Sequence, residues 1–328
     1  MEKIFIGVDV GGTNIRVAAV DPKGEILHKV RSPIEASRGR DRVTRNILSK
    51  VHEVLGRFSE NEFEVMGGGF GIPGAIALDR GIVIQSPNLP ALDGFNIRSW
   101  LEEGLRMPIF IENDANTFTL GEAWLGAAKG VKDFCCLTLG TGVGGGIVLN
   151  GEIWHGAEGK AGEIGHMIID VDGPPCKCGN HGCLEALTSA NAIRRMAIEA
   201  IRAGQKTDLI DRCGGELEAI TSKMVFESAM GGDILSRNIF QQMGTYLGVG
   251  LANLVNLLNV ELMVIGGQVS DAWDLFIDHA RRELEQRALG SMGKRVKVER
   301  TRRGDDAGIL GAVYLVMREI GTVPLHPE

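Results

Sequence analysis

The sequence lacks the long apolar, basic and leader-like segments that direct a chain to a membrane, to nucleic acid or out of the cell. No uninterrupted apolar run reaches about 18 residues, so no transmembrane helix is expected. The net charge is −7 and no basic block occurs, which argues against nucleic acid as the main partner. Residues 1–6 look like the start of a strand rather than a signal peptide, so we expect a cytoplasmic protein without a membrane partner.

Cysteine is scarce, and half of it lies in one short loop. Six cysteines occur in 328 residues, and Cys176, Cys178 and Cys183 form a Cys-x-Cys-x4-Cys pattern. A disulfide is disfavoured because Cys176 and Cys178 are too close to bridge comfortably, and nothing marks the chain as secreted. Free thiols suit a reducing cytoplasm. The other three cysteines are Cys135, Cys136 and Cys213.

The cysteine loop has the composition of a metal site. His166 lies ten residues before the first cysteine, and three thiolates with one imidazole suit a closed tetrahedral zinc site. Gly179 and Gly182 allow the sharp turns that such a loop needs. Two carboxylates, Glu163 and Glu185, bracket the loop, so folding around zinc would bring them together.

Strands and helices alternate along the chain, which is typical of an α/β protein. The length of 328 residues predicts about two domains. Strands are expected at 4–10, 17–20, 25–28, 66–70, 109–111, 134–139, 147–149, 152–154, 262–265 and 296–299. Helices are expected at 38–58, 96–105, 115–127, 190–203, 222–230, 234–258, 272–287 and 307–320.

The chain carries the signs of an internal duplication. Residues 4–27 and 134–154 each run strand, glycine-rich turn, strand, tight turn, strand, and Gly-Glu-Ile occurs at both 24–26 and 151–153. We therefore predict two related halves, each opening with an antiparallel ribbon. The zinc loop would be inserted after the second ribbon.

The turn of the first ribbon is a candidate phosphate-binding loop. Gly11 and Gly12 would let backbone N–H groups point into the turn and surround an anion, and Thr13 adds a hydroxyl donor. Asp9 could hold Mg²⁺, and Arg16 completes the pattern Asp-x-Gly-Gly-Thr-x-x-Arg. An ordinary hairpin with a structural aspartate is the alternative. The loop is not of the Walker type, because no Gly-Lys-Ser/Thr follows.

The second ribbon has a similar turn, which includes Gly140, Thr141 and Gly142. A hairpin packed close to another backbone is again the alternative. Two such loops at equivalent points of two halves could hold a polyphosphate between them. Gly266 and Gly267, after a buried strand, would suit the close approach of a flat base or ribose.

Asn113 and Asp114 lie where an expected strand ends and a helix begins. Strand ends face the ligand crevice in open α/β sheets, so Asp114 is a candidate catalytic residue, although it could serve only as a helix cap. Glu163 and Glu185 could bond sugar hydroxyls or could be surface charges. We expect His155 and His181 to be solvated or to support other residues. The tryptophans are expected in the core, at Trp100, Trp124, Trp154 and Trp273.

Taken together, these motifs resemble the ROK family of repressors, open reading frames and kinases. The resemblance spans residues 4–315 and rests on Asp9–Arg16, Glu112–Asn116, Leu139–Gly146, Glu163–His166 and Cys176–Glu185. It implies the duplicated actin-like ATPase or sugar kinase fold, which is ribonuclease H-like, with two domains around a cleft. We expect residues 1–113 and 306–328 to form the small domain and 114–305 the large one, with the zinc insertion at 163–185.

The resemblance also implies roles for single residues. It makes Asp114 the catalytic base and assigns structural zinc to His166 and the three cysteines of the loop. It assigns the sugar to Gly74, Asn88, Asn113, Asp114, Glu163, His166 and Glu185. It assigns ATP and Mg²⁺ to Asp9, Gly11, Gly12, Thr13, Arg16, Gly140, Thr141, Gly142, Gly266 and Gly267. One departure is Thr301–Arg303, where related chains often carry small or apolar residues.

We therefore expect a kinase that phosphorylates the 6-hydroxyl of a hexose with ATP, most like the glucokinases of the family. The segment 86–90 looks like those members. An N-acetylglucosamine or N-acetylmannosamine kinase is the alternative substrate assignment, and ADP or polyphosphate are alternative donors. A repressor would carry a helix-turn-helix ahead of the first ribbon, whose turn here begins at Gly11. We also expect a homo-oligomer, either a dimer or a tetramer.

Overall fold

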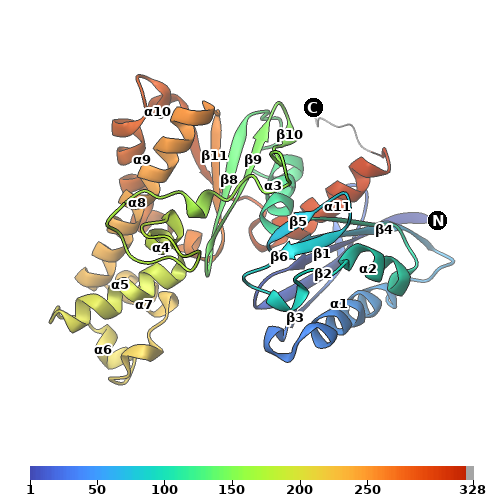
Figure 1. The fold of residues 1–328 in the computed structure, drawn as a ribbon, viewed down its shortest axis with the longest axis horizontal. Helices are drawn as coiled ribbons and strands as arrows, with labels where there is room; N and C mark the ends of the chain where they lie inside the picture. Colours follow the sequence, from blue (N-terminus) through green and yellow to red (C-terminus); the bar gives the residue numbers. More distant parts are fainter. Residues whose placement is uncertain (323–328) are drawn as a thin grey trace. The chain divides into compact units, whose positions relative to one another are not determined.

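The computed structural model describes residues 1–322 as an α/β fold, which confirms the predicted class (Figure 1). It contains two five-stranded sheets and one two-stranded sheet. In the described part of the chain, no helix is both long enough and apolar enough to cross a membrane.

The first large sheet has the strand order β3-β2-β1-β4-β7. Its strands are β1 (Glu2–Val10), β2 (Asn14–Val20), β3 (Ile26–Pro33), β4 (Phe63–Ile72) and β7 (Ile109–Asn113). The first three strands pair antiparallel and form the predicted ribbon, whereas β4 pairs parallel with both β1 and β7. The carboxyl ends of β1, β4 and β7 therefore lie at the same edge.

The second large sheet repeats this order as β10-β9-β8-β11-β12. Its strands are β8 (Phe134–Leu139), β9 (Val143–Leu149), β10 (Glu152–Ile153), β11 (Leu262–Gly266) and β12 (Lys297–Arg300). The corresponding strands match the predicted duplication, although β10 is much shorter than β3. A separate hairpin of β5 (Ala75–Ala77) and β6 (Ile82–Gln85) was not predicted.

The eight expected helices are all present, with ends within a few residues of the predicted ones. They are α1 (Arg40–Leu55), α2 (Ile97–Leu105), α3 (Asp114–Leu125), α5 (Ala190–Arg202), α7 (Ser222–Met230), α8 (Ile234–Leu258), α9 (Trp273–Arg287) and α11 (Ala307–Glu319). Short helices that the periodicity did not reveal are α4 (Leu184–Thr188), α6 (Leu209–Arg212) and α10 (Met292–Arg295).

Helices cover both faces of the first sheet. Along β1, Ile4, Ile6 and Val8 belong to one buried cluster, which includes residues of α1 and α2, while Phe5 belongs to a second cluster with residues of α3 and α11. This alternation follows from the two-residue period of a strand. Gly7 lies on the α11 face, where an added Cβ would come 2.5 Å from the Ile309 carbonyl oxygen. The missing side chain allows α11 to lie directly against β1.

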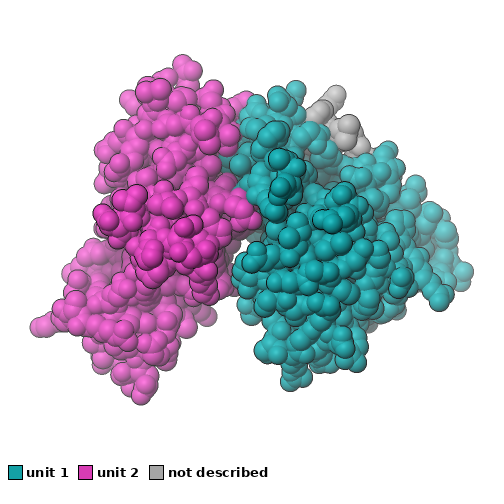
Figure 2. All heavy atoms as spheres, viewed as in Figure 1, with its two compact units in different colours: residues 1–136, 146–162, 301–328 teal, residues 137–145, 163–300 magenta. Residues whose placement is uncertain are grey.

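The chain divides into two compact units, shown in Figure 2. Unit 1 contains Met1–Cys136, Gly146–Gly162 and the chain from Thr301 onward, and unit 2 contains Leu137–Gly145 and Glu163–Arg300. The predicted domain division, at 113/114 and 305/306, stays a prediction. The C-terminal part of its small domain, 323–328, lies outside the described residues.

One expectation about the core is wrong. Trp154 is 55% exposed, although Trp124 is buried and Trp100 packs at the edge of a core cluster. Strand β10 ends at Ile153, and Trp154 follows it with its N–H still bonded to the Ile147 carbonyl at 2.8 Å.

Candidate functional site

The first glycine-rich turn carries a charge pair at its base. Asp9, near the end of β1, is the cross-strand partner of Arg16 on β2, and Arg16 Nη1 lies 2.8 Å from Asp9 Oδ2. Burial raises the pKa of Asp9 above its usual range, and the neighbouring Arg16 opposes that rise. The turn is closed by a bond of 2.9 Å from Gly11 N to the Asn14 carbonyl. Gly12 lies beside Asn88, since an added Cβ would be 3.1 Å from Asn88 Cβ.

Asn113 and Asp114 stand at the end of β7, at the same sheet edge as Asp9. Asn113 Oδ1 accepts bonds from the N–H groups of Ala115 and Asn116, at 2.9 and 3.2 Å, so Asn113 is the residue that caps α3. Its Nδ2 donates to the carbonyl of Gly74 at 3.0 Å. The structure therefore brings together three of the predicted sugar-binding residues: Gly74, Asn113 and Asp114. Asp114 is the first residue of α3, and its Oδ1 accepts a 3.0 Å bond from Ala115 N.

A buried carboxylate beside this junction was not predicted to have a role. Glu112 is almost fully buried, and its Oε1 accepts from Asn113 N at 2.7 Å and from Asn116 Nδ2 at 3.0 Å. Its Oε2 lies 2.7 Å from His155 Nε2. The hydrogen bond to Glu112 raises the pKa of His155 above its ordinary value. His155 thus supports another residue, as expected, and Glu112 ties it to the Asn113–Asp114 junction.

In unit 2, the second glycine-rich turn is held by two later segments of the chain. Gly140 O accepts from Ala190 N, and Thr141 O accepts from Asn191 Nδ2, both at 2.8 Å. Val143 N donates to Glu185 Oε2 at 3.0 Å. The loop is thus braced by the N-terminal turn of α5 and by a carboxylate at the end of the cysteine loop.

Gly267, directly after β11, lies against the end of β8. Its φ is +82°, and an added Cβ would clash with the backbone of Leu139. Both features require glycine at this position. Gly267 therefore lies beside Leu139, the residue before the second glycine-rich turn. The nucleotide-binding role of Gly266 and Gly267 stays a prediction.

The cysteine loop brings four potential metal ligands together. One ligand atom each from His166, Cys176, Cys178 and Cys183 lies within 4.8 Å of the others. The Sγ atoms of Cys178 and Cys183 are 3.6 Å apart, and Cys176 Sγ is 3.8 Å from His166 Nδ1. With Zn–S bonds of about 2.3 Å, a tetrahedral site has edges of about 3.8 Å, so the spacing fits zinc. All three thiols are free, which excludes a disulfide here.

The two carboxylates that flank the cysteine loop, Glu163 and Glu185, contact different groups. His166 Nδ1 faces the thiols, while His166 Nε2 is 3.9 Å from Glu163 Oε2. Glu185 lies near the ligand cluster, since Cys176 Sγ is 3.8 Å from its Oε1, and its other oxygen holds Val143. Burial raises the pKa of the Cys183 thiol to about 12 in the metal-free protein. A metal would therefore displace a proton from this thiol.

The candidate residues form two groups, one in each unit. The group in unit 1 contains Asp9, Gly11, Gly12, Thr13, Arg16, Gly74, Asn88, Asn113 and Asp114. The group in unit 2 contains Gly140, Thr141, Gly142, Glu163, His166, Glu185, Gly266, Gly267 and the three loop cysteines. Within each group the structure brings residues that are distant in sequence close together.

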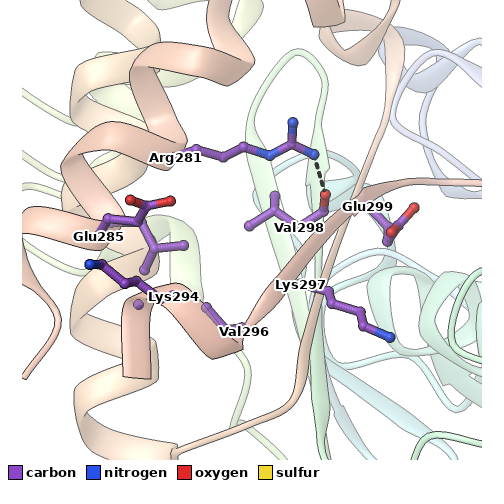
Figure 3. A pocket seen from close by; sticks show the side chains of 9 residues that line it. Arg281, Glu285, Lys294, Val296, Lys297, Val298 and Glu299 are labelled. Atoms are coloured by element: carbon purple, nitrogen blue, oxygen red, sulfur yellow. Dashed lines mark hydrogen bonds between the residues drawn. The ribbon is translucent and has the colours of Figure 1, made fainter. Parts of the chain in front are cut away.

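A separate hollow of about 220 Å³ lies on unit 2 among α9, α10 and β12 (Figure 3). Arg281 crosses it and donates to the Val298 carbonyl at 2.9 Å. Its other charged lining residues have both signs: Glu285, Lys294, Lys297 and Glu299. None of the predicted site residues lines this hollow.

Comparison with known proteins decides the family. The ROK family profile matches residues 5–319, which is nearly the whole chain. The chain belongs to the ROK family. The ROK glucokinase of Streptomyces griseus, whose crystal structure holds glucose and AMPPNP, superposes with a TM-score of 0.85 at 30% identity. The match covers 96% of this chain and 99% of that one. The predicted actin-like sugar kinase fold is thereby confirmed.

Curated ROK relatives include both enzymes and regulators. A glucokinase of Halalkalibacterium halodurans is 38% identical over 97% of this chain and 96% of its own length. A xylose repressor of Caldicellulosiruptor bescii is 28% identical over 98% of this chain and 79% of its own length. The family alone therefore does not separate catalysis from regulation, and the site residues must do so.

Proposed function

We propose that this ROK protein is a glucokinase that transfers the γ-phosphoryl group of ATP to the 6-hydroxyl of glucose. The observation that carries the proposal is the junction of β7 and α3, where Asp114 follows the strand and Asn113 is fixed by its bond to Gly74. A carboxylate at the end of a central strand is suited to accept a proton in a ligand crevice. The likeness to glucokinases of the family supports the same reading.

In the proposed mechanism, Asp114 accepts the proton of the sugar hydroxyl as its oxygen attacks phosphorus. A sugar hydroxyl is a poor nucleophile at neutral pH, so a positioned base is needed as the new bond forms. The residues proposed to bind the sugar are Asn113, Asn88, Gly74, Glu163, His166 and Glu185. Most of the remaining catalysis in such a transfer is positioning and charge stabilisation. Water is the competing acceptor, and its exclusion protects the phosphoryl group.

The two glycine-rich turns would bind the nucleotide phosphates. Backbone N–H groups of Gly11–Thr13 and Gly140–Gly142 are the donors suited to phosphate oxygens. Gly266 and Gly267, which follow β11, are the residues proposed to lie against the nucleoside. Mg²⁺ neutralises phosphate charge when bound, and the Asp9 carboxylate offers the oxygen ligand that this ion prefers.

The four residues of the cysteine loop would hold structural zinc. Zinc supplies a closed four-ligand crosslink, with no open position for a substrate. Its proposed effect is to fix Glu163 and Glu185, the carboxylates that bracket the loop. Glu185 would then link sugar recognition to the second phosphate loop through its bond to Val143 N.

The test is a coupled assay that compares kcat/KM for glucose, N-acetylglucosamine and N-acetylmannosamine, each with ATP, ADP or polyphosphate as donor. We expect glucose with ATP to give the highest value. A site that bonds the 2-hydroxyl leaves polar groups unpaired when that hydroxyl is replaced. Preference for an N-acetylated sugar would assign the protein to the alternative kinase class. Sugar binding without any phosphorylation would instead indicate a sugar-sensing regulator.

The cellular location, the oligomeric state and the partners of the enzyme are proposed on more general grounds. The free thiols of the described residues support a cytoplasmic location for the protein. We expect a homo-oligomer, dimer or tetramer, and size-exclusion chromatography with light scattering would measure it. The proposed partners are a hexose and a nucleotide, with no nucleic acid or membrane.

A further inference from the structure

The segment after β12 is anchored to unit 1 by a buried carboxylate. Glu122, near the end of α3, has no exposed surface. It accepts bonds from Thr301 Oγ1 at 2.5 Å, from the N–H groups of Arg302 and Arg303 at 3.2 and 3.0 Å, and from Ala127 N at 2.7 Å. A buried carboxylate is costly unless its oxygens are bonded, and four donors satisfy this one.

Two further bonds complete this anchor. Arg303 Nε donates to the carbonyl of Leu125 at 2.5 Å, and Gly304 N donates to Thr301 Oγ1 at 2.9 Å. The structure gives Thr301–Arg303 a role, because the threonine hydroxyl and the Arg303 side chain both fasten the segment to the end of α3.

The anchored segment leads directly to the charge pair of the first glycine-rich turn. Asp305 Oδ1 lies 3.2 Å from Arg16 Nη2, while Arg16 Nη1 bonds Asp9 Oδ2 at 2.8 Å. Three residues after Asp305, Gly308 in α11 lies against Asp9, since an added Cβ would be 3.0 Å from Asp9 Cγ. The segment therefore contacts Asp9 in two ways, by packing and through Arg16.

The arrangement divides one guanidinium between two carboxylates. An arginine alone with a carboxylate tends to bond it with two parallel N–H groups, which occupies both oxygens. Here the second terminal nitrogen is taken by Asp305. The contact between Arg16 and Asp9 is thus limited to one oxygen, Oδ2.

We propose that Asp305 is a positioning residue that keeps Arg16 from occupying both oxygens of Asp9, and so leaves Asp9 able to serve nucleotide-bound Mg²⁺. This inference rests on the proposed ATP-dependent function. In this proposal Asp305 contacts neither substrate nor metal. Its effect passes through Arg16, and the Glu122 anchor sets where Asp305 stands.

A purely structural role for Asp305 predicts a different result. The Asp305 side chain is 62% exposed, and exposed ion pairs contribute about 0–1 kcal/mol to stability. The chain also offers a matched neighbour. Asp306 pairs with Lys29 at 2.6 Å and does not reach Arg16 in the described structure, so it shares the segment and the charge but not the proposed role.

The experiment measures binding of AMPPNP by calorimetry over a series of Mg²⁺ concentrations, in wild type, Asp305→Asn and Asp306→Asn. In Asp305→Asn we expect the Mg²⁺ concentration for half-maximal nucleotide binding to rise about two- to fivefold, the range set by an exposed charge pair. Binding of AMPPNP without Mg²⁺ should not weaken, because the freed guanidinium is still cationic. Asp306→Asn should keep the wild-type Mg²⁺ dependence, and all three proteins should unfold at similar urea concentrations.

Several outcomes would overturn the inference. An unchanged Mg²⁺ requirement in Asp305→Asn, or an equal shift in Asp306→Asn, removes the special role of Asp305. Equal loss of binding with and without Mg²⁺ would indicate general damage to the turn. If wild type binds no AMPPNP at any Mg²⁺ concentration, the proposed ATP-dependent function is wrong. If wild type binds AMPPNP with Mg²⁺ but Asp305→Asn behaves in the same way, only the role of Asp305 is wrong.

The anchor can be tested separately with Thr301→Val, which removes the hydroxyl that bonds both Glu122 and Gly304. We expect the same direction of change in Mg²⁺ dependence as in Asp305→Asn, together with a lower urea midpoint. The double variant Thr301→Val/Asp305→Asn should shift the Mg²⁺ requirement no further than Asp305→Asn alone. A fully additive shift would show that the anchor does not act through Asp305.

Discussion

The two sheets share one strand order but obtain the charges at their glycine-rich turns in different ways. The first ribbon carries its own pair, with Asp9 on β1 facing Arg16 on β2. The second ribbon takes a carboxylate from outside, since Glu185 at the end of the cysteine loop holds Val143 N. The last strands of the two sheets also differ, because β7 ends at Asn113, directly before Asp114, whereas β12 leads into the anchored segment at Thr301.

The two halves keep the same strand order, but the groups proposed for catalysis and binding differ between them. The first half is proposed to hold the proton acceptor and the metal-facing carboxylate. The second depends on an inserted loop, for which we propose a structural metal. Each half should therefore fail in its own way when a single group is changed.

The largest effect is expected at the first half, in Asp114→Asn. The change keeps the shape and the hydrogen bond to Ala115 N but removes the basicity, so kcat should fall by about 10²–10⁴. Glucose affinity, measured by calorimetry, should change far less, because the lost interaction belongs mainly to the transition state. Glu163→Gln serves as the contrast and should weaken glucose binding as well as turnover. Near-normal kcat in Asp114→Asn would rule out this base.

The next effect is expected in the second half, in Cys178→Ser. The variant should lose about one equivalent of zinc, because the thiolate ligand is gone. Glucose affinity should fall by at least about tenfold, the equivalent of one charge-assisted hydrogen bond, as Glu163 and Glu185 lose their fixed positions. Metal analysis and calorimetry give the two values. Full glucose affinity in the metal-free variant, or no zinc in freshly purified wild type, would contradict this prediction.

A smaller change tests the link between the cysteine loop and the second turn. In Gly142→Ala the added Cβ would clash with the Glu185 carboxylate, whereas no atom lies within 4 Å of one added at Gly140. We expect kcat/KM for ATP to fall by about 3- to 10-fold in Gly142→Ala, because the Glu185 bond to Val143 is displaced. Gly140→Ala should lower it less. Equal losses in the two variants would show that the turn does not depend on Glu185.

The smallest effect concerns the pH dependence of stability, in His155→Gln. The groups around His155 are Glu112, Glu152 and Arg318, and the bond to Glu112 raises the pKa of His155 above its ordinary value. The protonated pair therefore stabilises the fold fully below the ordinary histidine pKa of about 6.5. This contribution is lost as the pH rises through the raised value. The difference in urea midpoint between wild type and His155→Gln should therefore shrink between about pH 5.5 and about pH 8.5, because His155 loses its proton within this range. A difference that stays constant with pH would count against the charged pair.

Much of the framework could be predicted because it depends on local patterns. Helix α8 spans the predicted residues, since its apolar positions repeat at helical spacing and Asp233 caps its start. Strand β8 also spans its predicted range, because it is a buried apolar run that ends at a glycine-rich turn. The four potential metal ligands lie close together in sequence, so their spacing alone indicated a common site.

What could not be predicted depends on contacts between distant segments. Glu112 and His155 are ordinary residues in the sequence, and only the fold places their side chains 2.7 Å apart. The same holds for Asp305, whose role depends on Arg16 far upstream. The hairpin of β5 and β6 could not be predicted, because its strands are too short to show the two-residue alternation of a strand. The exposure of Trp154 is a property of the folded surface, which hydropathy does not reveal.

The position of α11 has a consequence for how the protein is made. Ile309 and Val313 of this last helix belong to the same buried cluster as Phe5 and Val20 of the first ribbon. A ribosome releases α11 only after residues 137–300 have been synthesised, which takes roughly 10–30 s at bacterial rates of about 5–20 residues per second. During that time α3 is already available to this face of the first sheet, but the apolar surface that α11 covers stays open. The nascent chain therefore exposes this surface to chaperones and to aggregation until α11 emerges, although its first strands are complete much earlier.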